Sequence, residues 1–338
     1  MSDEGDPAGN REDEHPLIDA DEDEGVGDLD NISTASLRSS FLQPVYSHGR
    51  RYQSYRDGEY HRPNDEVSLL CYMTDGISCL KTLQEELRRL DWMDEIFFLI
   101  NKRKLHLAPV GHGSLRVLDI GFGTGMWAMA MGDKYPQAEI IGVDISASAP
   151  EWVPPNTRFE IADIEDEWTF SAPFDYIHCR YMAGAIRDWP QLMRRTFENL
   201  KPGAWAEFAD LEIDYYSQDG TLTEDDAIPR WIKLATQGME DLGRTLRPGR
   251  RLEGWVRDAG FVNVNVVRSP VPVGPWPKNK DLKQIGLLNV VQLSEGLTGL
   301  NVRLFCDFLG WTRPELDILM MEVRNDFKNP AIHSIYDM

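Results

Sequence analysis

A strand-like apolar run followed by three alternating glycines is the feature that most restricts what this chain can fold into. It reads VLDIGFGTGMWAMAMG at residues 117–132, with Gly121, Gly123 and Gly125 in the turn. Glycine permits a tight turn and lets a ligand touch the main chain. A helix that starts after the turn offers N–H groups and the positive end of its dipole. The segment therefore predicts a strand–turn–helix unit that binds a nucleotide or the carboxylate of an amino-acid-like ligand.

The spacing of these glycines differs from that of the dinucleotide fingerprint, which is G-x-G-x-x-G. Here the sixth position is Met126, and the pattern is G-x-G-x-G preceded by Asp119. A glycine cluster with a purely structural role is the competing interpretation.

Short apolar strands alternate with helical segments from residue 115 onward. This alternation is typical of a doubly wound, mainly parallel α/β sheet. The expected strands are residues 116–120, 139–144, 158–162, 174–178, 204–211 and 262–267, and the expected helices are 126–134, 191–200 and 250–259. Helical periodicity also precedes this region at 66–107 and follows it at 281–328. The expected divisions are a disordered acidic tail (1–40), an arm with helices (41–107), a ligand-binding core (108–275) and a helical lid (276–338).

Polar residues follow three of the expected strands at the point where each strand ends. Asp144 ends IIGVDIS, Asp163 follows FEIADIED, and Cys179-Arg180-Tyr181 follow the next strand. Ligands of such sheets bind at the carboxyl ends of the strands, where a carboxylate accepts bonds from ribose hydroxyls. Asp163 and the next backbone N–H are expected to hold the edge of an adenine. Each acid taken alone is more often a cap or turn residue, but their common register favours a nucleoside site.

The motifs VLDIGFGTGMW, GVDIS, ADIED, FDYIHCRYMAGAIRDWP and LKPGAWAEFAD resemble those of class I S-adenosylmethionine-dependent methyltransferases. The finer resemblance, over roughly residues 45–338, is to the fungal LaeA-like family. It rests on RRYQSYRDGEYHRPNDE, RDWPQL, PVPVGPWPKNKDLKQIG and LGWTRPELDILMMEVRNDFKNPAIHSIY. The resemblance implies a Rossmann-like class I methyltransferase sheet with N-terminal helices and a C-terminal helical lid.

The resemblance also implies roles for individual residues. The three glycines would surround the amino-acid moiety of S-adenosylmethionine, Asp144 its ribose and Asp163 its adenine, with Arg180 or its neighbours near the methionine part. The predicted cofactor-binding residues are Asp119, Gly121, Gly123, Gly125, Asp144, Ile145, Asp163, Ile164 and Arg180.

The sequence names no catalytic base. Methyl transfer from a sulfonium needs no acid for the leaving group, and needs a base only for a hydroxyl or a protonated amine. The candidates near strand ends are His178, Asp210, Glu212 and Tyr181. For His178 a satisfied core position is favoured. His and Cys residues are too scattered for a metal site.

The formal net charge of -21 is unevenly distributed, because residues 1–30 hold thirteen acidic residues and one basic residue, Arg11. Such a block predicts a disordered tail. The remaining mildly acidic domain argues against direct nucleic-acid binding. The absence of a signal peptide, of a long apolar run and of a CxxC pair predicts reduced thiols and a nuclear or cytoplasmic protein without a membrane segment. The cysteines are Cys71, Cys79, Cys179 and Cys306.

The chain departs from the family pattern after His333 and Tyr336, where members usually continue into a last strand. Without that strand the sheet would keep an unpaired edge, which is an association liability. We expect a partner or swapped segment on this edge, a six-stranded sheet, or an atypical protein.

Three functions follow from these observations. The leading hypothesis is a methyltransferase that regulates fungal secondary metabolism and development with protein partners, acting on a protein acceptor or on itself. The second is an O- or N-methyltransferase of small molecules in a secondary-metabolite pathway. The third is a scaffold with little activity, which the intact glycines, Asp144 and Asp163 disfavour.

Overall fold

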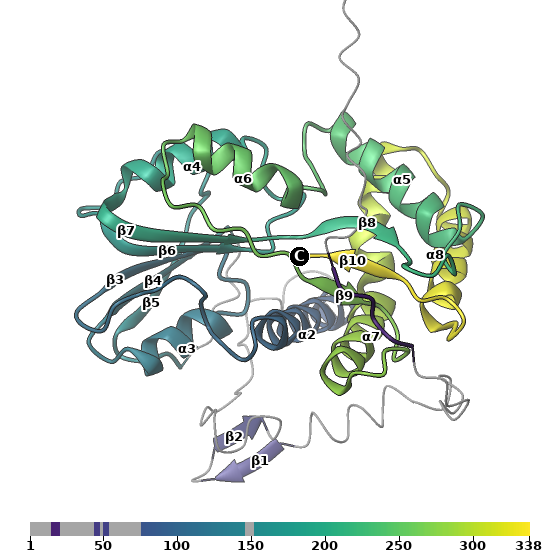
Figure 1. Cartoon of the computed structure of the whole chain (residues 1–338), viewed down its shortest axis with the longest axis horizontal. Coiled ribbons are helices and arrows are strands. Elements are labelled where there is room, and N and C mark those ends of the chain that lie inside the picture. Colours follow the sequence, from purple (N-terminus) through teal and green to yellow (C-terminus); the bar gives the residue numbers. More distant parts are fainter. Residues whose placement is uncertain (1–14, 21–43, 48–49, 54–75, 146–151) are drawn as a thin grey trace, which may run out of the picture.

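The computed structural model accounts for most of the chain after residue 75 (Figure 1). The residues that it describes are 15–20, 44–47, 50–53, 76–145 and 152–338. Of the expected acidic tail (1–40), all but residues 15–20 lies outside this set. Of the arm with helices (41–107), it describes residues 76–107 and the antiparallel hairpin of β1 (Pro44–Ser47) and β2 (Arg50–Gln53).

A five-stranded parallel sheet forms the centre of one lobe, in the order β5-β4-β3-β6-β7. Its strands are β3 (Arg116–Ile120), β4 (Glu139–Asp144), β5 (Thr157–Ile161), β6 (Phe174–Arg180) and β7 (Leu200–Ala209). The middle strands are almost wholly buried because helices cover both of their faces. The strand order reverses between β3 and β6, so this sheet has a topological switch point at β3. The predicted doubly wound fold is confirmed.

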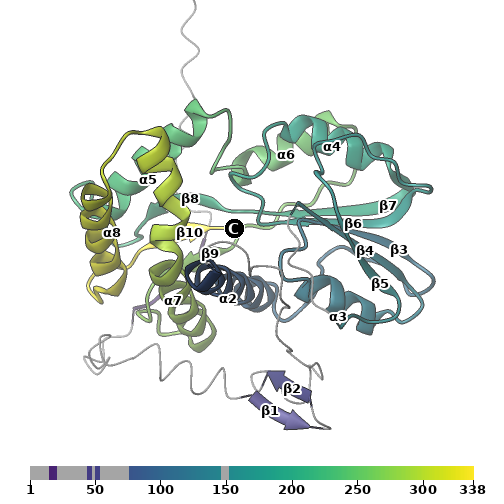
Figure 2. The same cartoon turned by 180° about the vertical axis from the view of Figure 1, so that it is seen from behind.

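Helices cover both faces of this sheet (Figures 1 and 2). On one face lies α3 (Met126–Lys134); on the other lie α4 (Trp189–Glu198) and α6 (Gly249–Asp258). Asp188 precedes α4 and accepts a hydrogen bond from the N–H of Gln191 at 2.8 Å, which satisfies one orphan donor of the helix. The rings of Trp189 and Trp255 stack 5.6 Å apart and join α4 to α6.

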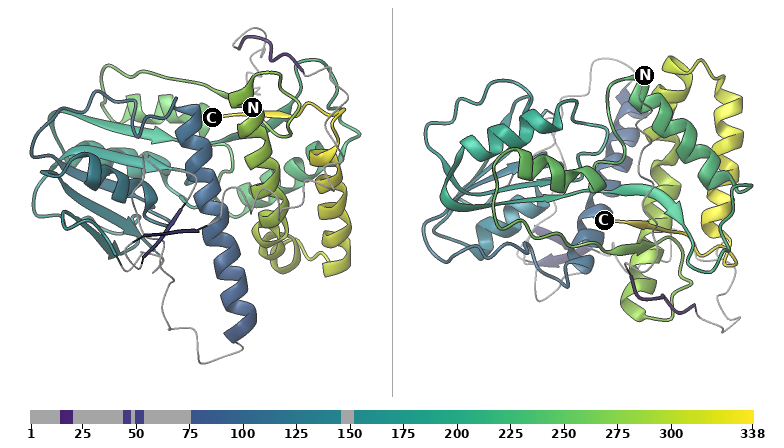
Figure 3. Two further views of the ribbon diagram at one scale, coloured as in Figure 1. Left: turned by 90° about the horizontal axis from the view of Figure 1, so that it is seen from below. Right: turned by 45° about the horizontal axis from the view of Figure 1, so that its top comes forward.

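A second lobe packs helices around a three-stranded antiparallel sheet, in the order β8-β10-β9. Its elements are α2 (Gly76–Ile100), β8 (Glu212–Tyr216), α5 (Ala227–Asp241), β9 (Pro270–Pro272), α7 (Lys280–Val302), η2 (Arg303–Phe308), α8 (Arg313–Lys328) and β10 (Ile335–Asp337). β8 continues the line of β7 after Asp210 and Leu211, and α2 runs beside α7 (Figure 3). Tyr336 of β10 is buried at the centre of this core. The C-terminal segment is therefore helical, as expected, but its last residues complete a sheet.

One expected strand of the core, residues 262–267, is wrong. These residues pair with no other part of the chain that the structure describes, and the parallel sheet ends at β7. A strand exists only through its pairing, so a strand-forming sequence without a neighbour stays irregular. The sheet has five strands rather than six, and the outer edge of β7 is unpaired among the described residues.

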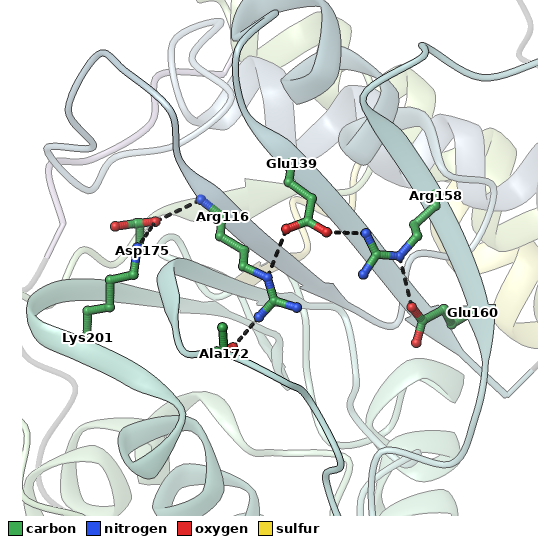
Figure 4. Close-up of polar contacts among 7 residues, drawn as sticks. All are labelled: Arg116, Glu139, Arg158, Glu160, Ala172, Asp175 and Lys201. Carbon is green, nitrogen blue, oxygen red and sulfur yellow. Dashed lines mark hydrogen bonds and ion pairs between the residues drawn. The ribbon is translucent and has the colours of Figure 1, made fainter.

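Charged side chains connect neighbouring strands at their amino ends (Figure 4). Glu139 accepts from Arg116 of the adjacent strand at 2.9 Å and also pairs with Arg158. Asp175 accepts from the N–H of Arg116 at 2.8 Å and from Lys201 at 2.7 Å. These contacts occupy the end of the sheet opposite the glycine turn, so they link neighbouring strands without entering the predicted site.

Candidate functional site

The three glycines of the turn after β3 all adopt backbone conformations that favour glycine. Their φ angles are 71° at Gly121, 56° at Gly123 and 76° at Gly125. A side chain at such positions costs roughly 1–2 kcal/mol. α3 begins directly after Gly125, and no described side chain caps its first turn. Its terminal N–H groups and dipole thus make a site suited to a carboxylate.

Two side chains from distant segments lie against this glycine loop. A Cβ atom at Gly121 would stand 2.3 Å from the sulfur of Met182, and one at Gly123 would stand 3.6 Å from Leu90. Met182 follows β6, and Leu90 belongs to α2. The loop is therefore contacted by the segment after β6 on one side and by α2 on the other.

Asp144, the last residue of β4, reaches back to the glycine loop. Its carboxylate Oδ2 accepts a hydrogen bond from the N–H of Gly123 at 2.9 Å. An ionised carboxylate can accept about four hydrogen bonds, so it can hold this loop and also bind hydroxyl groups. The next residue, Ile145, has 73% of its surface exposed, and Ile161 at the end of β5 has 65%. The exposed side chain of Ile145 suits a flat ring beside the Asp144 carboxylate.

Asp163 and Ile164 follow β5 at the same edge of the sheet. The Asp163 carboxylate accepts from the N–H of Glu165 at 2.9 Å and so shapes its own turn. The Ile164 side chain is buried, and its carbonyl accepts from the Trp168 indole N–H at 2.9 Å. Contact of Ile164 with a ligand would thus be through its backbone rather than its side chain.

Asp119 and His178 form a buried pair inside the sheet, on the neighbouring strands β3 and β6. The Asp119 carboxylate lies 2.8 Å from Nδ1 of His178, and both residues are 3% exposed. The imidazole stacks on Trp127 of α3, with ring centres 3.7 Å apart. His178 is therefore a core residue whose hydrogen bonding is satisfied, as the sequence favoured. Asp119 lies in β3, the strand that leads into the glycine loop.

Arg180 and Tyr181, at the end of β6, both contact α2. The Arg180 guanidinium pairs with Asp94 and lies 4.8 Å above the ring of Phe97. The Tyr181 hydroxyl accepts a hydrogen bond from Arg89 at 2.6 Å, and the φ of Tyr181 is 59°. Arg180 thus ties β6 to α2. The strained backbone of Tyr181 is held in place by the contact of its side chain with α2.

Asp210, directly after β7, is buried beside the segment that follows β6. Its carboxylate accepts from the N–H groups of Met182 at 2.6 Å, Ala183 at 3.3 Å and Leu211 at 2.8 Å. Burial raises the pKa of Asp210 to about 7, although these bonds favour the ionised form. Burial also raises the pKa of Glu212, which pairs with Arg250. Asp210 thus binds backbone N–H groups and Glu212 binds a charged side chain. Both acids therefore position the segments next to them.

The sequence predicted the residues at the strand ends but not the residues that pack around them. Arg89, Leu90 and Asp94 lie on α2, where helical periodicity predicts only packing. Met182 stood within the quoted motif FDYIHCRYM without an assigned role. These contacts join residues about ninety positions apart, as for Arg89 and Tyr181, and no local pattern signals them.

Within the described segments, no group of three or more His, Cys, Asp or Glu residues is placed to bind a metal ion. Of the helices that the structure describes, none has the length and apolarity needed to cross a membrane.

Comparisons with known proteins identify the family. Residues 83–266 match the methyltransferase domain family. Methyltransferase pytC of Aspergillus terreus is 39% identical over 321 residues, which cover 95% of this chain and 93% of that protein. Secondary metabolism regulator LAE1 of Cochliobolus heterostrophus is 30% identical over 293 residues, covering 85% of this chain and 90% of that protein.

Among solved structures, phosphoethanolamine N-methyltransferase 2 of Haemonchus contortus aligns with 16% identity and a TM-score of 0.43, over 93% of this chain and 73% of that one. The family assignment rests on the sequence matches, on the parallel sheet order observed here and on the glycine loop at its switch point. This chain belongs to the LaeA-like family of class I S-adenosylmethionine-dependent methyltransferases.

Proposed function

We propose that S-adenosylmethionine binds across the carboxyl ends of β3, β4 and β5. The observation that carries this proposal is the Asp144–Gly123 hydrogen bond of 2.9 Å, which joins a hydroxyl-binding carboxylate to a carboxylate-binding loop. The amino-acid part would lie on Gly121, Gly123 and the start of α3, and the ribose on Asp144.

The adenine would lie between the apolar surface of Ile145 and the turn at Asp163 and Ile164. The high exposure of Ile145 supports this position, since its side chain is available to a flat ring. Asp119 and Arg180 would act indirectly, because one is buried against His178 and the other is paired with Asp94.

The acceptor would approach from the ends of β6 and β7, where Met182 lies next to Gly121 and Tyr181 contacts α2. The bound cofactor supplies an electrophilic methyl group whose leaving group is a neutral thioether. The contribution of this chain is alignment and exclusion of water, worth up to about 7–11 kcal/mol. α2 supports that role, since Leu90 lies over the glycine loop and Arg89 holds the Tyr181 hydroxyl.

Calorimetric titration of the full chain with S-adenosylmethionine tests this site. Saturable binding that is lost in Asp144→Ala supports the assignment. If no heat is observed at millimolar cofactor, the cofactor site is wrong and the scaffold alternative gains support.

For the biological role, we propose a regulator of fungal secondary metabolism and development that acts with protein partners in the nucleus or cytoplasm. The 30% identity to a secondary metabolism regulator over 85% of this chain supports it. The acceptor would be a protein or the chain itself.

A second candidate is a small-molecule O- or N-methyltransferase of a secondary-metabolite pathway. The higher identity to methyltransferase pytC, 39% over 95% of this chain, favours it. The position of Tyr181 beneath α2 also favours it, because an acceptor there would be enclosed.

Affinity capture from the native fungus followed by mass spectrometry separates these roles. A stoichiometric protein partner supports regulation. Methyl transfer to an extract metabolite without such a partner supports the second candidate. Fluorescence of a tagged full chain in hyphae tests the expected compartment.

A further inference from the structure

A cavity formed by described residues lies beside the edge of the parallel sheet, and its lining does not include the glycine loop. It has a volume of about 590 Å³. One wall is β7 over residues 204–209, and the opposite wall is residues 261–269; residues of α2, of the loop at 107–109 and of α6 also line the cavity. The C-terminal residue Met338 lines one end, where it exchanges two backbone hydrogen bonds with Ser269. We call this cavity the β7 groove.

The wall formed by β7 is an open strand edge. The carbonyl of Ala209 accepts from Tyr181 after β6, at 2.9 Å, so Ala209 points its backbone groups toward β6. The N–H and C=O of one residue lie on the same side of a strand, and the side alternates along the chain. Ala206 and Phe208 therefore present their N–H and C=O groups to the groove.

The opposite wall is also suited to strand pairing. Its sequence, VNVNVV at residues 262–267, predicts a strand, yet it pairs with no described strand. Its valines are unusually exposed: 78% for Val262, 46% for Val266 and 54% for Val267. A single extended segment placed in the groove would pair with β7 on one side and could pair with this wall on the other.

The charges of the lining indicate what kind of segment would enter. Five acidic residues but two arginines line the groove. Glu212 pairs with Arg250 and Glu253 with Arg257. Glu207 accepts hydrogen bonds from the N–H groups of Leu107 and Ala108, which carry no compensating charge. Residues 31–338 carry a formal charge of -9, since residues 1–30 account for -12 of the -21 of the whole chain. A second copy would bring like charge to this edge, whereas a basic segment would be attracted to it.

We infer that the β7 groove binds an extended segment of a different protein, with alternating apolar side chains and basic residues at its ends. The segment would add a strand to the sheet, so main-chain hydrogen bonds supply affinity and the apolar lining selects alternate side chains. Methyl transfer is not needed for this association, so the inference is independent of the proposed cofactor site.

The test uses the full chain and a fluorescein-labelled synthetic peptide, KVTVTVK, in fluorescence anisotropy. Two control peptides carry N-methyl groups on the odd or the even residues, which removes the donors of one edge at a time. We expect saturable binding of the parent peptide and at least about tenfold weaker binding of both controls. Amide hydrogen exchange at Ala206 and Phe208 is expected to be fast in the free protein and slow with the peptide.

Val266→Arg places a positive charge on the exposed far wall and should weaken peptide binding by about tenfold or more. Ile318→Arg, which changes an exposed apolar residue of α8 outside the groove, is the matched control and should leave binding unchanged. Titration with S-adenosylmethionine in the same variants reports the cofactor site separately.

Three results would overturn the inference. The first is equal binding of the parent and N-methylated peptides, or none at millimolar concentration. The second is unchanged binding in Val266→Arg. The third is a concentration-dependent dimer that itself protects Ala206 and Phe208, which would make a second copy the occupant.

Discussion

The Asp144 carboxylate and the Gly123 N–H are joined by a hydrogen bond of 2.9 Å, so the end of β4 is attached to the loop that follows β3. The two residues are 21 positions apart and become neighbours because β3 and β4 pair in parallel register. A single carboxylate thus shapes the loop and, in the proposed site, also binds the ribose.

Replacing Asp144 should separate these two tasks. Asp144→Ala loses both, and we expect cofactor affinity to fall by at least about tenfold, since each hydrogen bond to a charged group contributes about 1.5–3 kcal/mol. Asp144→Asn keeps an acceptor for Gly123 but lacks the second carboxylate oxygen, so its affinity should lie between the two. Calorimetry measures both constants. Unchanged affinity in Asp144→Ala would remove the ribose assignment.

Gly121→Ala should be destabilising for two separable reasons. The left-handed φ of 71° costs roughly 1–2 kcal/mol for alanine. The new Cβ would also stand 2.3 Å from the Met182 sulfur, and overpacking typically costs about 1–3 kcal/mol. Adding Met182→Ala should recover the second cost but not the first. Urea unfolding of the two single variants and the double variant gives the coupling; strictly additive free energies would contradict the contact.

The buried Asp119–His178 pair should matter for the free energy of unfolding. Asp119→Ala leaves the His178 Nδ1 without its 2.8 Å partner, at a cost of about 1–3 kcal/mol. Asp119→Asn retains an acceptor and should cost less, with cofactor affinity close to that of the parent. Asp258→Ala, at the exposed end of α6, is the control. A large loss of affinity in a stable Asp119→Asn protein would instead make Asp119 a direct ligand.

Stability should depend on pH through Asp210. Burial raises the pKa of this carboxyl from 3.8 to about 7, so the folded protein binds more protons than the unfolded chain between these values. The free energy of unfolding therefore falls as pH rises through this window, by at most about 1.4 kcal/mol per pH unit for one group.

Asp210→Asn should flatten that dependence in urea unfolding measured from about pH 4 to about pH 8. Part of the slope should remain, because burial raises the pKa of Glu212 as well. An unchanged slope would show that Asp210 does not titrate in this range.

Local patterns accounted for the parts of the molecule that depend on neighbouring residues. The apolar run before Gly121 predicted β3, and Asp144 and Asp163 marked the ends of β4 and β5. The side-chain patterns of strands and helices repeat every few residues, so a short stretch of sequence can predict them. Parallel strands share one carboxyl edge, so the order of the strands along the chain predicts where the site lies. Helix α5 and the sheet of β8, β9 and β10 were not predicted; β9 and β10 have three residues each and depend on pairing across the chain.

The sequence by itself determined the fold class, the glycine loop and the register of the acidic residues, because each depends on the spacing of residues that are close together in the chain. Only the tertiary structure decided what those residues face. It paired Asp119 with His178, Arg180 with Asp94 and Tyr181 with Arg89, and it left residues 262–267 across a groove from β7. Each of these outcomes depends on which distant segment occupies the neighbouring space, and that is settled by packing of the whole chain.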